Sequence, residues 1–123
     1  MHNRNFYTYI LTNQYKTVLY VGVTNNLARR LVEHYIGKEG SFTTKYQVYY
    51  LLWYETTPYI LNAIAREKEL KLLLRDSKMA LIKETNPELA FRNSEILEHW
   101  PPTQEDIREL ITYLQRFPNE REK

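Results

Sequence analysis

The stretch YTYILTNQYKTVLYVG, residues 7–22, decides how the chain begins to fold. Phe6–Thr12 and Val18–Val23 are rich in β-branched and aromatic residues, and the polar segment NQYKT between them is typical of a turn. The pattern predicts a β-hairpin. Because side chains alternate along a strand, Tyr9 and Tyr20 would lie on one face of this hairpin, where they can meet across the ladder.

The later elements predict a small α/β (α+β) domain, with a mainly antiparallel sheet of about three strands flanked by helices. LARRLVEHY predicts a helix after the polar segment TNN, and residues 46–55 predict a third, mostly apolar strand. Pro58 would open a longer helix to about Arg75, and a shorter helix would end before Asn86 and Pro87. We expect a domain over residues 1–93 and a helical extension over residues 94–123, with one helix from Thr103 to about Phe117.

Composition limits the function classes. The 123 residues are 43% hydrophobic and contain no cysteine, which excludes disulfides, thiolate zinc sites and cysteine catalysis and favours a reducing cytoplasm. No stretch predicts a signal peptide or a membrane span. Residues 1–50 carry six Lys/Arg against two Asp/Glu, whereas residues 51–123 carry eleven against thirteen. A basic N-terminal half suits a polyanionic partner, although an asymmetry this modest is more often an ordinary solvated surface.

One acidic residue stands out on the long predicted helix. At 100° per residue, Glu67 falls in the middle of an apolar stripe formed by Ile60, Ala63, Ile64, Leu70 and Leu74. A carboxylate on a buried stripe requires compensation. It would pair with Lys71 one turn later, or it would hold a cation against the sheet.

The first predicted helix brings two further polar side chains together. Arg30 and His34 are four residues apart and share one flank of that helix, so they could address one ligand. The alternative is an exposed arginine and a half-buried histidine beside a core stripe. Arg29 points elsewhere on the helix and is predicted to be solvated. Gly22 marks a bulge, a strand end or a place where a ligand approaches the backbone.

Taken together, these residues resemble the GIY-YIG nuclease family. Tyr7-Thr8-Tyr9 stands where the family has GIY, and Tyr20-Val21-Gly22 stands where it has YIG. Arg30 and His34 follow Tyr20 by ten and fourteen residues, and AIAREKELK and NPEL supply Glu67 and Asn86 in the family's order. The likeness covers roughly residues 5–92 and looks most like the small stand-alone bacterial members of the URI type.

The resemblance implies a metal-dependent endonuclease that hydrolyses phosphodiester bonds, of DNA rather than RNA, and suggests DNA repair or recombination as its setting. Glu67 would hold one divalent cation, Mg²⁺ or Mn²⁺, and Arg30 would stabilise the phosphate charge. Tyr20 would orient or deprotonate the attacking water, while Tyr9 would position that water or share the role of the base. His34 could relay the proton, so the general base is Tyr20 or His34.

Three residues are expected to bind substrate: Gly22, Lys45 and Asn86. Val23 stands where some relatives have a lysine, and Lys45 in FTTKY could supply the positive charge instead. Two other functions stay open. One is a nucleic-acid-binding module without turnover, and the other is a protein-interaction adaptor that uses the final helix.

Overall fold

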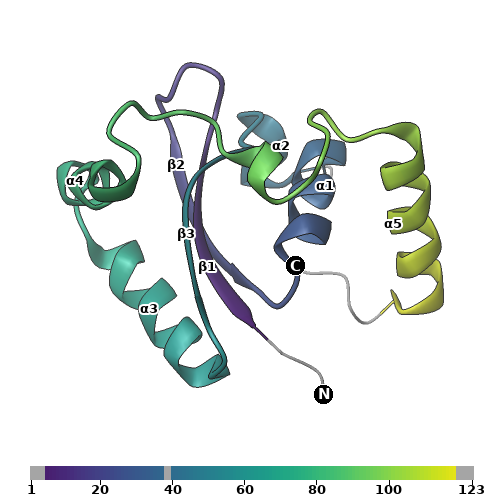
Figure 1. The fold of residues 1–123 in the computed structure, drawn as a ribbon, viewed down its shortest axis with the longest axis horizontal. Helices are drawn as coiled ribbons and strands as arrows, with labels where there is room; N and C mark the ends of the chain where they lie inside the picture. The colour runs from purple at the N-terminus through teal and green to yellow at the C-terminus, as the bar shows by residue number, and fades with distance from the viewer. Residues whose placement is uncertain (1–4, 38–39, 119–123) are drawn as a thin grey trace.

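The structure, a computed structural model, describes residues 5–37 and 40–118. Its centre is an antiparallel sheet of three strands in the order β2-β1-β3 (Figure 1). The strands are β1 (Phe6–Thr12), β2 (Leu19–Thr24) and β3 (Tyr50–Thr57). With helices on both faces, this confirms the predicted α+β class.

The predicted hairpin is present, and Asn13 organises its turn. The Asn13 side-chain oxygen accepts hydrogen bonds from the backbone N–H groups of Thr17 and Val18, which is the way asparagine commonly closes a turn. The register places Tyr9 opposite Gly22 and Leu11 opposite Tyr20. Tyr9 and Tyr20 are therefore diagonal neighbours on one face of the sheet.

That face is covered by α1 (Leu27–Ile36), which begins where Asn26 accepts a hydrogen bond from the Arg29 backbone and ends at Gly37 with a φ of 86°. A short helix, α2 (Phe42–Lys45), comes next. The third strand was predicted to start at residue 46, and that boundary is wrong. The chain turns at Gln47, whose φ is 54°, and β3 begins only at Tyr50.

The opposite face is covered by α3 (Ile60–Leu72) and α4 (Arg75–Thr85). The apolar stripe predicted for one long helix holds at Ala63 and Leu70, which are fully buried. It fails at Ile60, which begins α3 and is 50% exposed. It also fails at Leu74, which is 79% exposed, because α3 ends at Leu72 and the chain changes direction before α4. The sheet thus separates two apolar clusters. The cluster on the α1 side contains Tyr9, Leu11, Leu27, Leu31, Val48 and Leu51, and the other contains Ile10, Val21, Leu52, Trp53, Leu70 and Ile82.

The end of the described chain returns to the α1 side. After a 3₁₀ turn, η1 (Asn93–Glu95), the side chains of Ile96, Leu97 and Trp100 pack against the cluster that contains Tyr9. The last helix, α5 (Gln104–Arg116), lies along the outer side of α1. Its capping box between Thr103 and Asp106 confirms the predicted helix start. The division of the chain at residue 93 stays a prediction. None of the helices within residues 5–37 and 40–118 has the length and apolar character needed to cross a bilayer.

Candidate active site

Three of the predicted catalytic side chains form one buried cluster between α1 and the sheet. The Arg30 Nε–H donates to the Tyr9 hydroxyl at 3.2 Å, and the same hydroxyl lies 3.1 Å from His34 Nε2. Tyr9, His34 and Arg30 are 1%, 4% and 9% exposed. The other ring nitrogen of His34 lies 3.1 Å from Thr43 Oγ1 on α2. We call these four side chains the Tyr9 cluster.

The cluster has a defined charge state. Burial, and after it the positive charge of Arg30, lowers the pKa of His34 to about 3, so the imidazole is neutral at physiological pH. A neutral ring donates from one nitrogen and accepts at the other, and both nitrogens have partners in Tyr9 and Thr43. A ring with so low a pKa is a weak proton acceptor. Of the two candidate bases, the arrangement therefore favours Tyr20 over His34.

Tyr20 lies at the outer side of the Tyr9 cluster and is half-buried. Its ring centroid is 6.5 Å from that of Tyr9 and 5.4 Å from that of His34. The ring also stacks on Phe42 of α2, with centroids 6.3 Å apart and an angle of 24° between the ring planes. The Tyr20 phenol is thus the more accessible of the two, whereas Tyr9 is enclosed by Arg30 and His34.

Lys45 borders this region from α2. It is exposed, and its Nζ lies 5.3 Å from the centre of the Tyr46 ring, which is exposed as well and packs against Phe42. Exposed aromatic rings beside a lysine can stack on bases and attract phosphates. The position suits the predicted contact of Lys45 with substrate, which stays a prediction.

Gly22 has a clear reason to be glycine. A Cβ at this position would overlap both Cζ and the hydroxyl oxygen of Tyr9, and it would lie 2.7 Å from Cε1 of the same ring. Such a separation is shorter than any normal contact, so only glycine lets the Tyr9 ring approach the backbone of β2 this closely. Gly22 thus makes room for the ring of Tyr9, which was predicted to be catalytic. The contact of Gly22 itself with substrate stays a prediction.

Glu67 lies on α3, the helix that covers the other face of the sheet. Its side chain is 17% exposed, and its carboxylate lies 3.3 Å from the Lys71 Nζ. This confirms the ion pair, one of the two alternatives expected from the sequence, and the bound cation stays a prediction. α3 packs against β1 and β2, and Thr8 of β1 donates to the carbonyl of Ala63, one turn before Glu67. The helix that carries Glu67 and the helix that carries Arg30 and His34 thus cover opposite faces of the sheet. The hydrogen bonds that join the Tyr9 cluster do not include Glu67.

The side chain of Asn86 forms hydrogen bonds with backbone groups. The residue ends α4 and is 6% exposed. Its amide nitrogen donates to the carbonyls of Leu52 and Ala90, and its oxygen accepts from the Ala90 N–H. An amide has only two N–H donors, and both are used to fix the loop after α4 against β3. This geometry favours a structural role for Asn86, and its contact with substrate stays a prediction.

The prediction that Arg29 is solvated is wrong. Its Nη1 donates to the Tyr113 hydroxyl of α5 at 2.8 Å, and its Nε lies 3.2 Å from Glu33 Oε1. The other oxygen of Glu33 lies 3.4 Å from Arg30 Nη1. Glu33 and Tyr113 were not identified from the sequence. The i, i+3 and i, i+4 spacing of Glu33 from the two arginines was the available signal, whereas only the fold brings Tyr113 to α1.

Three comparisons relate this chain to known proteins. The UPF0213 protein of Syntrophus aciditrophicus (strain SB) is 39% identical over 83 residues, which are 67% of this chain and 93% of that protein. A solution NMR structure of a UPF0213 protein from Bacillus halodurans matches with a TM-score of 0.47 at 28% identity, over 76% of this chain and 96% of that one. The sequence model of the GIY-YIG catalytic domain matches residues 5–80, more than half of the chain. The chain therefore belongs to the GIY-YIG family.

Proposed function

We propose that this protein is a cytoplasmic endonuclease that hydrolyses phosphodiester bonds of nucleic acid, DNA rather than RNA, with the help of a divalent cation. A role in DNA repair or recombination is part of the same proposal. The observation that carries it is the Tyr9 cluster. A phenol, a guanidinium and a neutral imidazole are hydrogen-bonded beside the half-buried Tyr20, in a chain of the GIY-YIG family.

Arg30 supplies the positive charge for the phosphate. Its Nε is fixed on Tyr9, and its Nη1 faces the Glu33 carboxylate. A non-bridging phosphate oxygen is an acceptor of the same kind, so it would compete with Glu33 for Nη1. An arginine whose Nε is already held by Tyr9 can exchange its Nη1 contact from Glu33 to phosphate, and one donor aimed at the charge of the transition state is worth about 10²–10³ in rate.

Tyr20 is the group proposed to orient the attacking water and to take its proton. A free phenol with a pKa near 10 is about 0.1% ionised at neutral pH, so the base needs positive charge nearby. Tyr9 acts on the substrate less directly than Tyr20, because the Tyr9 hydroxyl is enclosed by Arg30 and His34. In this scheme His34 orients Tyr9 through a hydrogen bond and does not serve as the base.

The proposed cation site rests on Glu67. Residues 5–37 and 40–118 contain no group of three or more His, Asp or Glu side chains arranged to hold a metal. Magnesium sites commonly use one or two carboxylates and complete their coordination with water and substrate phosphate, so one carboxylate suits the proposal. Glu67 would exchange its contact with Lys71 for Mg²⁺ or Mn²⁺, and such a cation would supply positive charge for the departing 3′ oxygen.

The test is cleavage of labelled DNA and RNA, as single strands, flaps, branched duplexes and plain duplexes, with Mg²⁺, Mn²⁺ or EDTA. We expect metal-dependent cleavage by the wild type and its loss in Tyr20→Phe, which keeps the ring against His34 and Phe42. Tyr15→Phe, at an exposed tyrosine in the hairpin turn, is the matched control and should cleave normally. A wild type that cleaves none of these polymers contradicts the proposal.

A further inference from the structure

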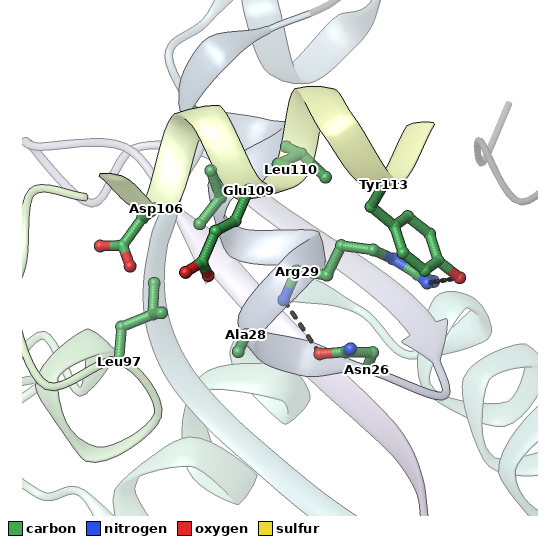
Figure 2. Close-up of a pocket in the computed structure, with 9 residues that line it drawn as sticks. Asn26, Ala28, Arg29, Leu97, Asp106, Glu109, Leu110 and Tyr113 are labelled. Carbon is green, nitrogen blue, oxygen red and sulfur yellow. Dashed lines mark hydrogen bonds between the residues drawn. The ribbon is translucent and has the colours of Figure 1, made fainter. Parts of the chain in front are cut away.

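A helix outside the matched family region is connected to the arginine of the proposed site. α5 spans Gln104–Arg116, whereas the family model ends at residue 80. The contact between α5 and α1 includes the buried Leu110 and the pair of Arg29 with Tyr113 (Figure 2). Beside this pair the two helices leave a pocket of about 260 Å³, so their interface is not continuously packed. Arg29 is thus held by specific polar contacts.

Tyr113 holds Arg29 in two ways. Its hydroxyl accepts the 2.8 Å hydrogen bond from Nη1, and the guanidinium carbon lies 4.9 Å from the centre of its ring. Both contacts orient the planar guanidinium along the tyrosine, which Figure 2 shows. The Arg29 side chain is only 9% exposed, so solvent screens these interactions weakly.

Glu33 carries the connection onward to Arg30. One oxygen of its carboxylate lies 3.2 Å from Arg29 Nε, and the other lies 3.4 Å from Arg30 Nη1. The Glu33 and Arg30 side chains are 9% and 11% exposed. One largely buried carboxylate therefore contacts two guanidiniums. The oxygen that faces Arg29 is not the one that faces Arg30, so the contact with Arg29 weakens the attraction between Glu33 and Arg30.

We propose that Glu33 and Tyr113 are positioning residues for the proposed nuclease reaction. Tyr113 binds Arg29, and Arg29 faces one oxygen of Glu33. Arg30 then stays hydrogen-bonded to Tyr9 through Nε, and its Nη1 can leave the other oxygen of Glu33 to bind phosphate. We call Tyr113, Arg29 and Glu33 the Tyr113 relay. This inference rests on the proposed function, and it assigns to α5 the task of setting the charge and direction of Arg30.

The relay predicts a specific defect when Arg29 is removed. Glu33 can then turn both of its oxygens toward Arg30, and a two-point arginine–carboxylate pair is stronger and more rigid than a contact of 3.4 Å through Nη1. Phosphate would have to displace that pair. Removing the Glu33 charge as well should return Arg30 to phosphate, so Glu33→Gln should suppress the defect of an Arg29 variant.

The experiment uses the full chain and compares initial cleavage rates per folded molecule. We expect Arg29→Met to lower kcat about 10- to 100-fold, the size of a charge-assisted hydrogen bond. Tyr113→Phe should lower it less, about 5-fold, because phenylalanine keeps the ring against the Arg29 guanidinium. Arg29→Met/Glu33→Gln should recover to within about 3-fold of the wild type. Arg108→Met is the matched control, since it removes an arginine of α5 that, in the part of the chain the structure describes, pairs with the exposed Glu105.

A purely structural role gives a different pattern. It lowers the melting temperature and the activity together, and Glu33→Gln then adds to the damage of Arg29→Met; that result overturns the proposal. Variants that cleave like Arg108→Met overturn it as well. If the wild type cleaves nothing, the proposed function fails, and the Arg30 Nε–H signal in NMR spectra decides on the relay. A shift of that signal in Tyr113→Phe but not in Arg108→Met supports the relay, and an unchanged signal contradicts it.

Discussion

The ring of Tyr9 lies directly over the backbone of Gly22 on the neighbouring strand. This relationship links the two halves of the motif that resembles GIY and YIG. The tyrosine of the first half can reach Arg30 and His34 only because the glycine of the second half has no side chain beneath it.

Gly22→Ala should therefore destabilise the protein by about 1–3 kcal/mol, the usual cost of overpacking a core. The penalty should shrink in a Tyr9→Leu background, because leucine lacks the ring atoms that the new methyl group would meet. Urea denaturation of the four proteins measures the coupling between the two positions, expected at about 1 kcal/mol or more. Equal penalties in both backgrounds would show that Tyr9 is not the obstacle.

His34 should make stability depend on pH. Its pKa is about 3 in the folded protein and near 6.5 in an unfolded chain, so between these values the unfolded state binds more protons. The free energy of unfolding should thus fall as pH falls below 6.5, by about 1 kcal/mol per pH unit from this residue. Urea denaturation at pH 7 and pH 5.5 measures the slope. It should be smaller in His34→Gln and unchanged in His99→Gln, whose ring is exposed; the same slope in all three proteins would refute the assignment.

Asn86→Ala should lower stability without lowering the activity of the folded molecules. The substitution removes three hydrogen bonds and leaves the Leu52 carbonyl and the Ala90 backbone short of partners, at a cost of about 2–4 kcal/mol. Thermal unfolding and cleavage per folded molecule are the measurements, with the exposed Asn62→Ala of α3 as control. Loss of cleavage at normal stability would place Asn86 in the substrate site.

Glu67 and Lys71 should act in opposite directions on metal dependence. Glu67→Gln should abolish metal-dependent cleavage, because an amide is a poorer ligand for Mg²⁺. Lys71→Met removes a cation that competes for the carboxylate, and its half-maximal Mg²⁺ concentration should fall about 2- to 5-fold, in keeping with a partly exposed ion pair. The control is Lys68→Met, an exposed lysine of the same helix. An unchanged Mg²⁺ titration in both Glu67→Gln and Lys71→Met would remove Glu67 from the cation site.

The sequence was sufficient for the local parts of the fold. The turn residues around Asn13, the cap at Asn26 and the capping box at Thr103 act within a few residues, and each predicted an element that the structure contains. The segment at residues 46–49 was misleading, because its aromatic and β-branched residues favour a strand, whereas the chain turns at Gln47, which adopts a positive φ, and β3 begins only at Tyr50.

Residue types and spacing predicted those parts of the site that come from neighbouring elements of the chain. Tyr9, Arg30 and His34 come together as expected, since they share the hairpin and the helix directly after it. The roles of Arg29 and Asn86 depend on partners far along the chain, Tyr113 and the Leu52 carbonyl. Helical periodicity says which way such a side chain points but not what the tertiary fold places there.

The most direct test of the proposed nuclease is single-turnover cleavage by Arg30→Lys, compared with the wild type and with Arg66→Lys. Lysine keeps the positive charge but lacks the fixed fork that reaches both Tyr9 and a phosphate. Arg66 is an arginine of α3 that pairs with Glu55 and Glu69. We predict a loss of about 100-fold or more for Arg30→Lys, with the melting temperature retained, and a wild-type rate for Arg66→Lys. A folded Arg30→Lys protein that cleaves as fast as the wild type would contradict the claim that this cluster is the catalytic site.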